Sequence, residues 1–111
     1  FYDKNNGFAI GGDYTKPLEN ISNKIITSDG GKTWKTIAQN QDPGYRSCVQ
    51  YFPNSDSQSL IAVGFNGVDI SNDSGFSWNH INDEGYYTLR FLNDSIAYAS
   101  GNGKISKLHF K

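Results

Sequence analysis

The stretch "TSDGGKTW", Thr27 to Trp34, decides the fold class of this chain because a variant of it, "SNDSGFSW", recurs from Ser71 to Trp78. Both follow one pattern: Ser or Thr, any residue, Asp, any residue, Gly, any residue, Ser or Thr, and Trp. With this composition, about 0.004 matches are expected by chance, and two matches have a probability on the order of 10⁻⁵. The repetition therefore indicates a chain built from repeated structural units.

The similarity extends beyond the octapeptides. "LIAVGFNGVDIS" (60–71) aligns without a gap to "SIAYASGNGKIS" (95–106), and "CVQYF" (48–52) aligns to "TLRFL" (88–92). "GFAIGG" (7–12) matches the start of the first of these segments. Short runs rich in β-formers alternate with clusters of Gly, Asn, Asp and Ser, which is typical of strands joined by turns. A complete unit of four strands in about 40 residues has the size of one propeller blade.

We therefore predict an all-β chain that forms a partial β-propeller of consecutive four-stranded antiparallel blades. Residues 1–111 are expected to be a single partial domain of about two and a half blades. The first blade (1–43) lacks most of its first strand, the second (44–84) is complete, and the third (85–111) lacks its fourth strand. A propeller needs four to eight blades, so we expect a C-terminal part of a larger propeller, completed by its remaining blades or by other copies of the chain.

The first blade also carries an insertion, "DYTKPLENISN" (13–23), between its second and third strands. This segment is polar and contains Pro17, so we expect an exposed loop. The second blade spans the same gap with "FNG". Loops of this kind often carry function, although the insertion could equally serve no binding role.

Composition excludes several function classes. The formal net charge is −1 and the chain has few arginines, so nucleic acid is not an expected partner. No apolar run approaches the roughly 20 residues of a membrane-spanning helix. Cys48 is the single cysteine and has no adjacent histidine, so a buried, inert thiol is the expected role. No phosphate-binding glycine loop is present, and no cofactor is predicted.

Each octapeptide falls between the third and fourth strands of its unit, so it predicts a hairpin turn. An Asp carboxylate can accept hydrogen bonds from the following backbone N–H groups, and a Gly two residues later can adopt positive φ. Two lone carboxylates in separate turns form neither a calcium site nor a catalytic pair. We therefore assign structural turn roles to Thr27, Asp29, Gly31, Thr33 and Trp34, and to Ser71, Asp73, Gly75, Ser77 and Trp78.

The remaining ionisable residues predict no catalytic or metal centre. Asp69, Asp83 and Glu84 could be considered as a glycosidase pair, but solvated acids explain them better. His80 and His109 lie on different strands with no second ligand at metal spacing, which favours surface or packing roles. No catalytic, cofactor-binding or metal-binding residue is assigned.

A binding role is easier to derive than a catalytic one. In a propeller, the first strand of each blade lines the central channel, and these strands are here "YRSCVQYF" and "YYTLRFL". Apolar alternation directs Arg46, Gln50, Tyr86 and Arg90 away from the core, where they could hold a peptide or a glycan at the axis. The alternative is that all four are ordinary solvated strand residues.

The octapeptides resemble the Asp-box, or BNR repeat, of sialidases, sortilin-type receptors and some glycoside hydrolases. Together with Gly7 to Gly11 ("GFAIG"), they are most similar to the photosystem II assembly and stability factor family and its bacterial relatives. This resemblance implies a peripheral turn, a non-catalytic assembly or interaction scaffold, and export to the periplasm, cell surface or medium. A fragment of a sialidase-like or other glycoside hydrolase is the alternative, although Arg46 and Arg90 alone cannot supply a sialidase arginine triad.

Overall fold

A computed structural model describes residues 1–101 and 103–110, and every regular element in it is a β-strand. The predicted all-β class is confirmed. The strands are β1 (Gly7–Ile10), β2 (Lys24–Thr27), β3 (Lys35–Thr36), β4 (Cys48–Tyr51), β5 (Leu60–Gly64), β6 (Gly67–Ser71), β7 (Asn79–Asn82), β8 (Thr88–Phe91), β9 (Ile96–Gly101) and β10 (Lys104–His109).

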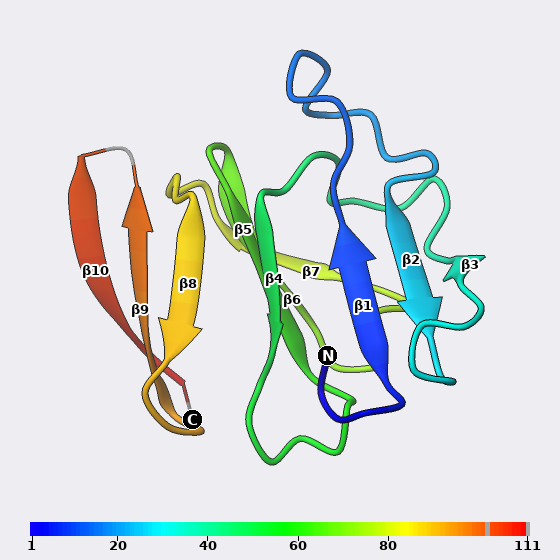
Figure 1. The fold of residues 1–111 in the computed structure, drawn as a ribbon. Coiled ribbons are helices and arrows are strands. Elements are labelled where there is room, and N and C mark those ends of the chain that lie inside the picture. Colours follow the sequence, from blue (N-terminus) through cyan, green and yellow to red (C-terminus); the bar gives the residue numbers. More distant parts are fainter. Residues whose placement is uncertain (102, 111) are drawn as a thin grey trace.

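The strands form three antiparallel sheets that stand side by side (Figure 1). The first sheet has the order β1-β2-β3, the second β4-β5-β6-β7, and the third β8-β9-β10. β4, the first strand of the second sheet, contacts both β1 and β8, so the second sheet lies between the other two. Within the described residues, β1 is an edge strand of the first sheet and β10 is an edge strand of the third.

The strand register corrects the gap-free alignment of residues 60–71 with 95–106. Val49 pairs with Ala62, whereas its counterpart Leu89 pairs with Ala99. Ala62 therefore corresponds to Ala99 and not to Ala97, so the true alignment is shifted by two residues from the gap-free one. The error has a physical origin, because side chains in a strand alternate with a period of two. A slip of two residues leaves the apolar pattern unchanged.

Two clusters of apolar side chains hold the three sheets together. Between the first and second sheets, Phe8 and Leu60 are buried, and Trp78 packs against them. Between the second and third sheets, Ile61 and Leu89 form the centre of a larger cluster. Each face of the second sheet is therefore covered by a neighbouring sheet, which explains why every residue of β5 is buried.

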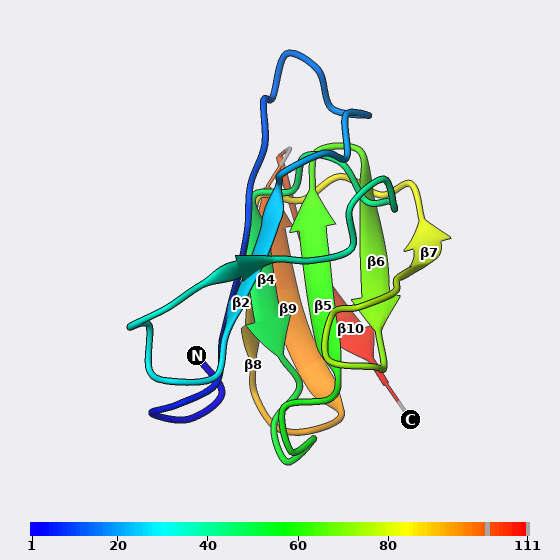
Figure 2. The same ribbon diagram turned by 90° about the vertical axis from the view of Figure 1, so that its right-hand side faces the viewer.

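The insertion between β1 and β2 projects beyond one end of the sheets (Figure 2). It is anchored to the connection between β3 and β4, because the backbone N–H of Tyr45 donates to the carbonyl of Pro17 at 3.0 Å. A Cβ at Gly44 would lie 2.2 Å from the same carbonyl, so this approach requires glycine. The insertion and this connection thus share one end of the molecule with the β5–β6 turn.

Candidate functional site

Both octapeptides fold into turns with the same hydrogen bonds. In the first, the Asp29 carboxylate accepts from the backbone N–H of Thr33 at 2.9 Å and from its hydroxyl at 2.6 Å. The Thr27 hydroxyl donates to Asp29 at 2.8 Å and accepts from the N–H of Gly31 at 3.0 Å. The indole N–H of Trp34 donates to the carbonyl of Gly31 at 3.1 Å. The second turn repeats each of these bonds with Ser71, Asp73, Gly75, Ser77 and Trp78.

These bonds engage the two carboxylates and lower their pKa values. The Thr33 hydroxyl, the Thr33 backbone and the Thr27 hydroxyl hold the pKa of Asp29 at about 2. At Asp73, burial acts to raise the pKa, but the hydrogen bonds from Ser77 and Ser71 together outweigh it and keep the pKa below the usual value. A carboxylate held ionised in this way is suited to fastening a turn and is a poor proton donor or acceptor at neutral pH.

The structure does not assemble the expected axial ring. Arg46 and Tyr86 are only 4% exposed each, so neither presents its side chain to a ligand. Gln50 is half-buried and shares a face of β4 with Cys48, which packs toward the third sheet, whereas Arg90 is exposed on the far face of the third sheet. Side chains of a strand point to the two faces of its sheet and not along its edge, so these four residues do not share one surface in the described structure.

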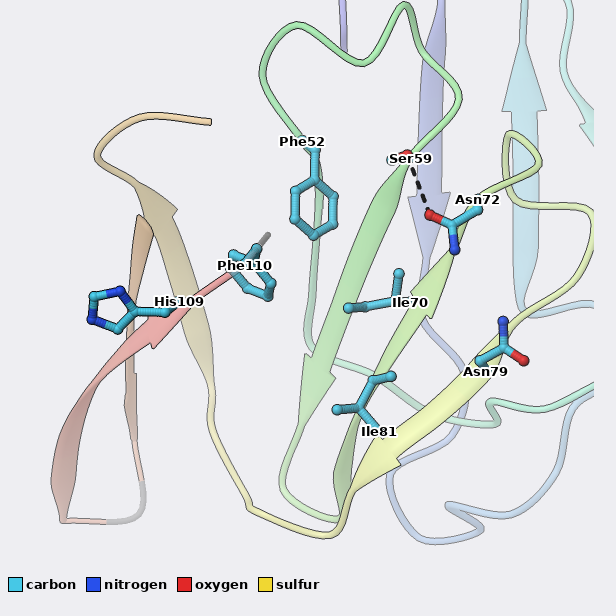
Figure 3. A pocket seen from close by; sticks show the side chains of 8 residues that line it. All are labelled: Phe52, Ser59, Ile70, Asn72, Asn79, Ile81, His109 and Phe110. Atoms are coloured by element: carbon cyan, nitrogen blue, oxygen red, sulfur yellow. Dashed lines mark hydrogen bonds between the residues drawn. The ribbon is translucent and has the colours of Figure 1, made fainter. Parts of the chain in front are cut away.

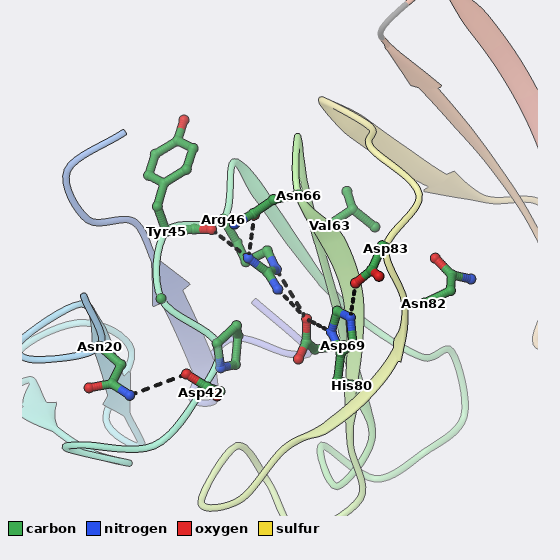
Figure 4. A network of polar contacts seen from close by, with 12 residues as sticks. Asn20, Asp42, Tyr45, Arg46, Val63, Asn66, Asp69, His80, Asn82 and Asp83 are labelled. Carbon is green, nitrogen blue, oxygen red and sulfur yellow. Dashed lines mark hydrogen bonds and ion pairs between the residues drawn. The ribbon is translucent and has the colours of Figure 1, made fainter. Parts of the chain in front are cut away.

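Arg46 is instead the centre of a buried polar network (Figure 4). Its Nη2 and Nε donate to one oxygen of Asp69 at 2.6 and 3.1 Å, and its Nη1 donates to the Asn66 side chain and the Tyr45 carbonyl, both at 2.8 Å. His80 Nδ1 lies 3.3 Å from the same Asp69 oxygen. The side chains of Arg46 and Asp69 are 5% and 1% exposed, so their charges neutralise each other away from solvent.

His80 connects this network to the surface. Its Nε2 lies 2.7 Å from a carboxylate oxygen of Asp83, whose side chain is 93% exposed. The hydrogen bond to Asp83, with a further contribution from Asp69, raises the pKa of His80. Gly67 makes room for the imidazole, because a Cβ there would lie 2.5 Å from His80 Cε1. The sequence analysis did not predict that Asp69 and His80 are in contact. The position of Asp69 within the apolar strand "GVDIS" was the available signal, because a buried acid needs a polar or charged partner.

A pocket of about 220 Å³ opens above this network, where the insertion meets the second sheet. Its floor is the Arg46–Asp69 pair, and its rim carries exposed Asp42, Asp83 and Leu18. The Asn20 amide donates to Asp42 at 3.3 Å, which leaves that carboxylate accessible. Arg46 neutralises Asp69, and the buried ammonium of Lys24 interacts with Asp42, so the site keeps one net negative charge when His80 is neutral. We call this feature the rim pocket; it is lined by Pro17, Leu18, Asp42, Pro43, Gly44, Arg46, Asn66, Asp69, His80 and Asp83.

A second, more open depression of about 460 Å³ lies between the second and third sheets (Figure 3). Its apolar side chains include Phe52 and Phe110, whose rings meet edge to face at a centroid distance of 4.8 Å. Ile70 and Ile81 continue the apolar surface along β6 and β7. His109 contributes only at the margin, so the depression contains no group of ionisable side chains that would support catalysis.

Cys48 is half-buried, with Sγ 4.0 Å from the carbonyl of Leu89. Within residues 1–101 and 103–110, no three His, Cys, Asp or Glu side chains are grouped to hold a metal ion. The same described residues include no helix that could cross a membrane.

Comparison with known proteins identifies the fold. No protein-family model matches the chain, and no curated protein matches it. Among solved structures, the match to "YCF48 bound to D1 peptide" has a TM-score of 0.68 and 19% sequence identity, and it covers 99% of this chain. The chain has the fold of part of a β-propeller. It spans 35% of the length of that YCF48 chain. The resemblance to a photosystem II assembly factor that the sequence predicted is therefore confirmed at the level of the fold.

Proposed function

We propose that this chain is part of a non-catalytic propeller module that binds an extended peptide segment of another protein, with one basic side chain of the peptide in the rim pocket. The fold similarity to YCF48, whose solved structure is a complex with a D1 peptide, is consistent with this proposal. Assembly or interaction scaffolding of the kind expected for Asp-box propellers would follow from such binding.

The observation that carries the proposal is the size and charge of the rim pocket. Its volume of about 220 Å³ lies below the roughly 300–1,000 Å³ of typical small-molecule sites. A cavity of this size suits one side chain of a longer ligand. Asp42 and Asp83 offer accessible carboxylates to a cation, and Leu18, which is 80% exposed, can cover the aliphatic stem of a lysine or arginine.

The test is fluorescence anisotropy with short threonine–valine peptides that differ in one central residue, Lys, Gln or Glu. We expect the Lys peptide to bind the protein most tightly. Asp83→Asn should weaken it about fivefold, since exposed ion pairs contribute up to about 1 kcal/mol. Leu18→Ser should also weaken binding. Asp94→Asn is the matched control, because Asp94 is an exposed acid in the turn between β8 and β9, at the opposite end of the strands.

Equal affinity for the three peptides, or equal loss in Asp83→Asn and Asp94→Asn, would contradict the proposal. A neutral oligosaccharide forms a further arm of the same assay. Saturable glycan binding that competes with no peptide would favour glycan recognition, the other ligand class expected from the sequence.

A further inference from the structure

The imidazole of His80 lies between two carboxylates, with one at each ring nitrogen (Figure 4). Its Nδ1 is 3.3 Å from an oxygen of Asp69, and its Nε2 is 2.7 Å from an oxygen of Asp83. A neutral imidazole has a single N–H, so it donates to one of these carboxylates and turns a lone pair toward the other. An imidazolium donates to both. The position of the ring therefore favours the protonated form.

Five further charged groups surround this ring. They are Asp69 of β6, Arg46 before β4, Lys24 of β2, Asp42 in the connection between β3 and β4, and Asp83 after β7. The β5–β6 turn adds only the neutral amide of Asn66, and the insertion adds only apolar side chains. Three carboxylates and two cations give the rim pocket one net negative charge, and protonation of His80 cancels it.

Asp83 is the carboxylate whose availability changes with the proton on His80. Its side chain is 93% exposed, whereas that of Asp69 is 1% exposed and paired with Arg46. A protonated His80 holds Asp83 in a charge-assisted hydrogen bond, which is stronger than a bond between neutral groups. When the proton leaves, the Asp83 carboxylate keeps its charge and loses its cationic partner. A proton on His80 and a cationic group of a ligand therefore compete for the same carboxylate.

The surroundings of this network are present within the chain. A sheet of a propeller has two neighbouring sheets, and the second sheet contacts both of its neighbours here through β4. Further sheets of a propeller would lie against the first or the third sheet. Asp69, His80 and Asp83 belong to the second sheet and to the segment directly after β7. Their accessibility is therefore not a consequence of the number of sheets.

We propose that His80 is a pH switch for the rim pocket: its protonation engages Asp83 and weakens the binding of a cationic side chain, and loss of the proton restores it. The proposal rests on the proposed function of this pocket. The hydrogen bond to Asp83, with a further contribution from Asp69, raises the pKa of His80 above its usual value, so the change occurs near neutral pH. The protonated form dominates below that pKa, so affinity for a cation rises as pH increases through it. By linkage, binding of the cation releases protons.

The experiment measures fluorescence anisotropy of the Lys and Gln peptides at pH 5.5 and 7.5. The readout is the ratio of the two affinities, because the Gln peptide reports every effect of pH that does not involve the cation. The peptide lysine and the aspartates of the pocket stay ionised at both pH values. We expect the preference for Lys to be about three- to fivefold smaller at pH 5.5, which is the range of a single exposed ion pair.

Two histidine variants assign the effect. His80→Gln carries no titrating group, so its preference for Lys should be equal at the two pH values. His109→Gln is the matched control, because His109 is the only other histidine and is exposed on β10. This control should keep the full pH dependence. Burial lowers the pKa of Lys24 to about 8, and any contribution of Lys24 would persist in His80→Gln. Melting temperatures at both pH values show that each variant is folded.

A second measurement uses the unmodified protein alone. Calorimetry of Lys-peptide binding at pH 6.5, in buffers of different ionisation enthalpy, should show release of protons. Proton uptake, or no proton exchange, would overturn the switch. So would a preference for Lys that is the same at pH 5.5 and 7.5, or an unchanged pH dependence in His80→Gln, and these results would leave the proposed function standing. Absence of a preference for Lys at both pH values would contradict the proposed function and the switch together.

Discussion

The two octapeptide turns have the same internal hydrogen bonds but different surroundings. The turn from Ser71 to Trp78 lies against the first sheet, where the rings of Trp78 and Phe8 pack at a centroid distance of 5.7 Å. The turn from Thr27 to Trp34 packs against Phe1, which is itself 66% exposed. Two kinds of interaction therefore stabilise these turns. The hydrogen bonds within the octapeptide are the same in both turns, whereas the packing of the turn depends on whether a neighbouring sheet lies against it.

The largest predicted difference between the turns concerns their glycines. Gly75 has φ +95° and Gly31 has φ +91°, so alanine at either position costs about 1–2 kcal/mol of backbone strain. At Gly75 a Cβ would also lie 2.3 Å from the buried Phe8 ring, whereas at Gly31 the nearest atom is 3.6 Å away. Overpacking adds about 1–3 kcal/mol. Gly75→Ala should therefore lower the free energy of unfolding by about 2–5 kcal/mol and Gly31→Ala by about 1–2, measured by urea denaturation. Equal losses of stability in the two variants would show that the first sheet does not constrain the second turn.

The tryptophans should show a smaller difference in the same direction. Each indole donates one hydrogen bond, at 3.1 Å from Trp34 and 2.9 Å from Trp78, so Trp→Phe should cost about 1 kcal/mol at both positions. Trp→Ala also removes the packed ring. We expect about 3 kcal/mol at Trp78, which is half-buried against Phe8, and about 1 kcal/mol at the more exposed Trp34. Thermal unfolding of the four variants measures both effects, and a larger loss at Trp34 would contradict the role assigned to the neighbouring sheet.

The smallest predicted effect is a dependence of stability on pH, which tests the Asp carboxylate that both turns contain. Asp29 has a folded-state pKa of about 2 against an ordinary value of 3.8, so its ionised form stabilises the fold above the ordinary value. That contribution is lost as pH falls through this interval. Asp29→Asn should lower the melting temperature at neutral pH, and the difference from the unmodified protein should shrink in acid. Asp73, whose pKa is also lowered, should behave in the same direction. A difference independent of pH would exclude the carboxylate charge as its cause.

Much of the fold could be predicted because its determinants are local. The octapeptide closes its hydrogen bonds within a few residues, and alternating apolar residues define each strand. The exact correspondence between the second and third sheets could not be predicted, because a shift of two residues preserves that alternation. Only the pairing of Leu89 with Ala99 reveals it.

The candidate site was predictable only in part. Arg90 lies outside the rim pocket. Arg46 does line this pocket, but it is buried by its pairing with Asp69, which lies 23 residues away in the chain. The rim pocket could not be found from the sequence, because it forms where the insertion meets the β3–β4 connection and the end of the second sheet. The contact between His80 and Asp69 likewise depends on the pairing of β6 with β7.

The sequence by itself determined the strands, the turns and the repeated unit, because short-range hydrogen bonds and a period of two are encoded in neighbouring residues. The tertiary structure alone decided which face of each sheet is buried. The same position holds Ile70 beneath a neighbouring sheet and Lys107 in solvent. A side chain is buried only when other residues pack over it. Strand pairing and sheet packing bring those residues from distant parts of the chain, so the local sequence does not determine burial.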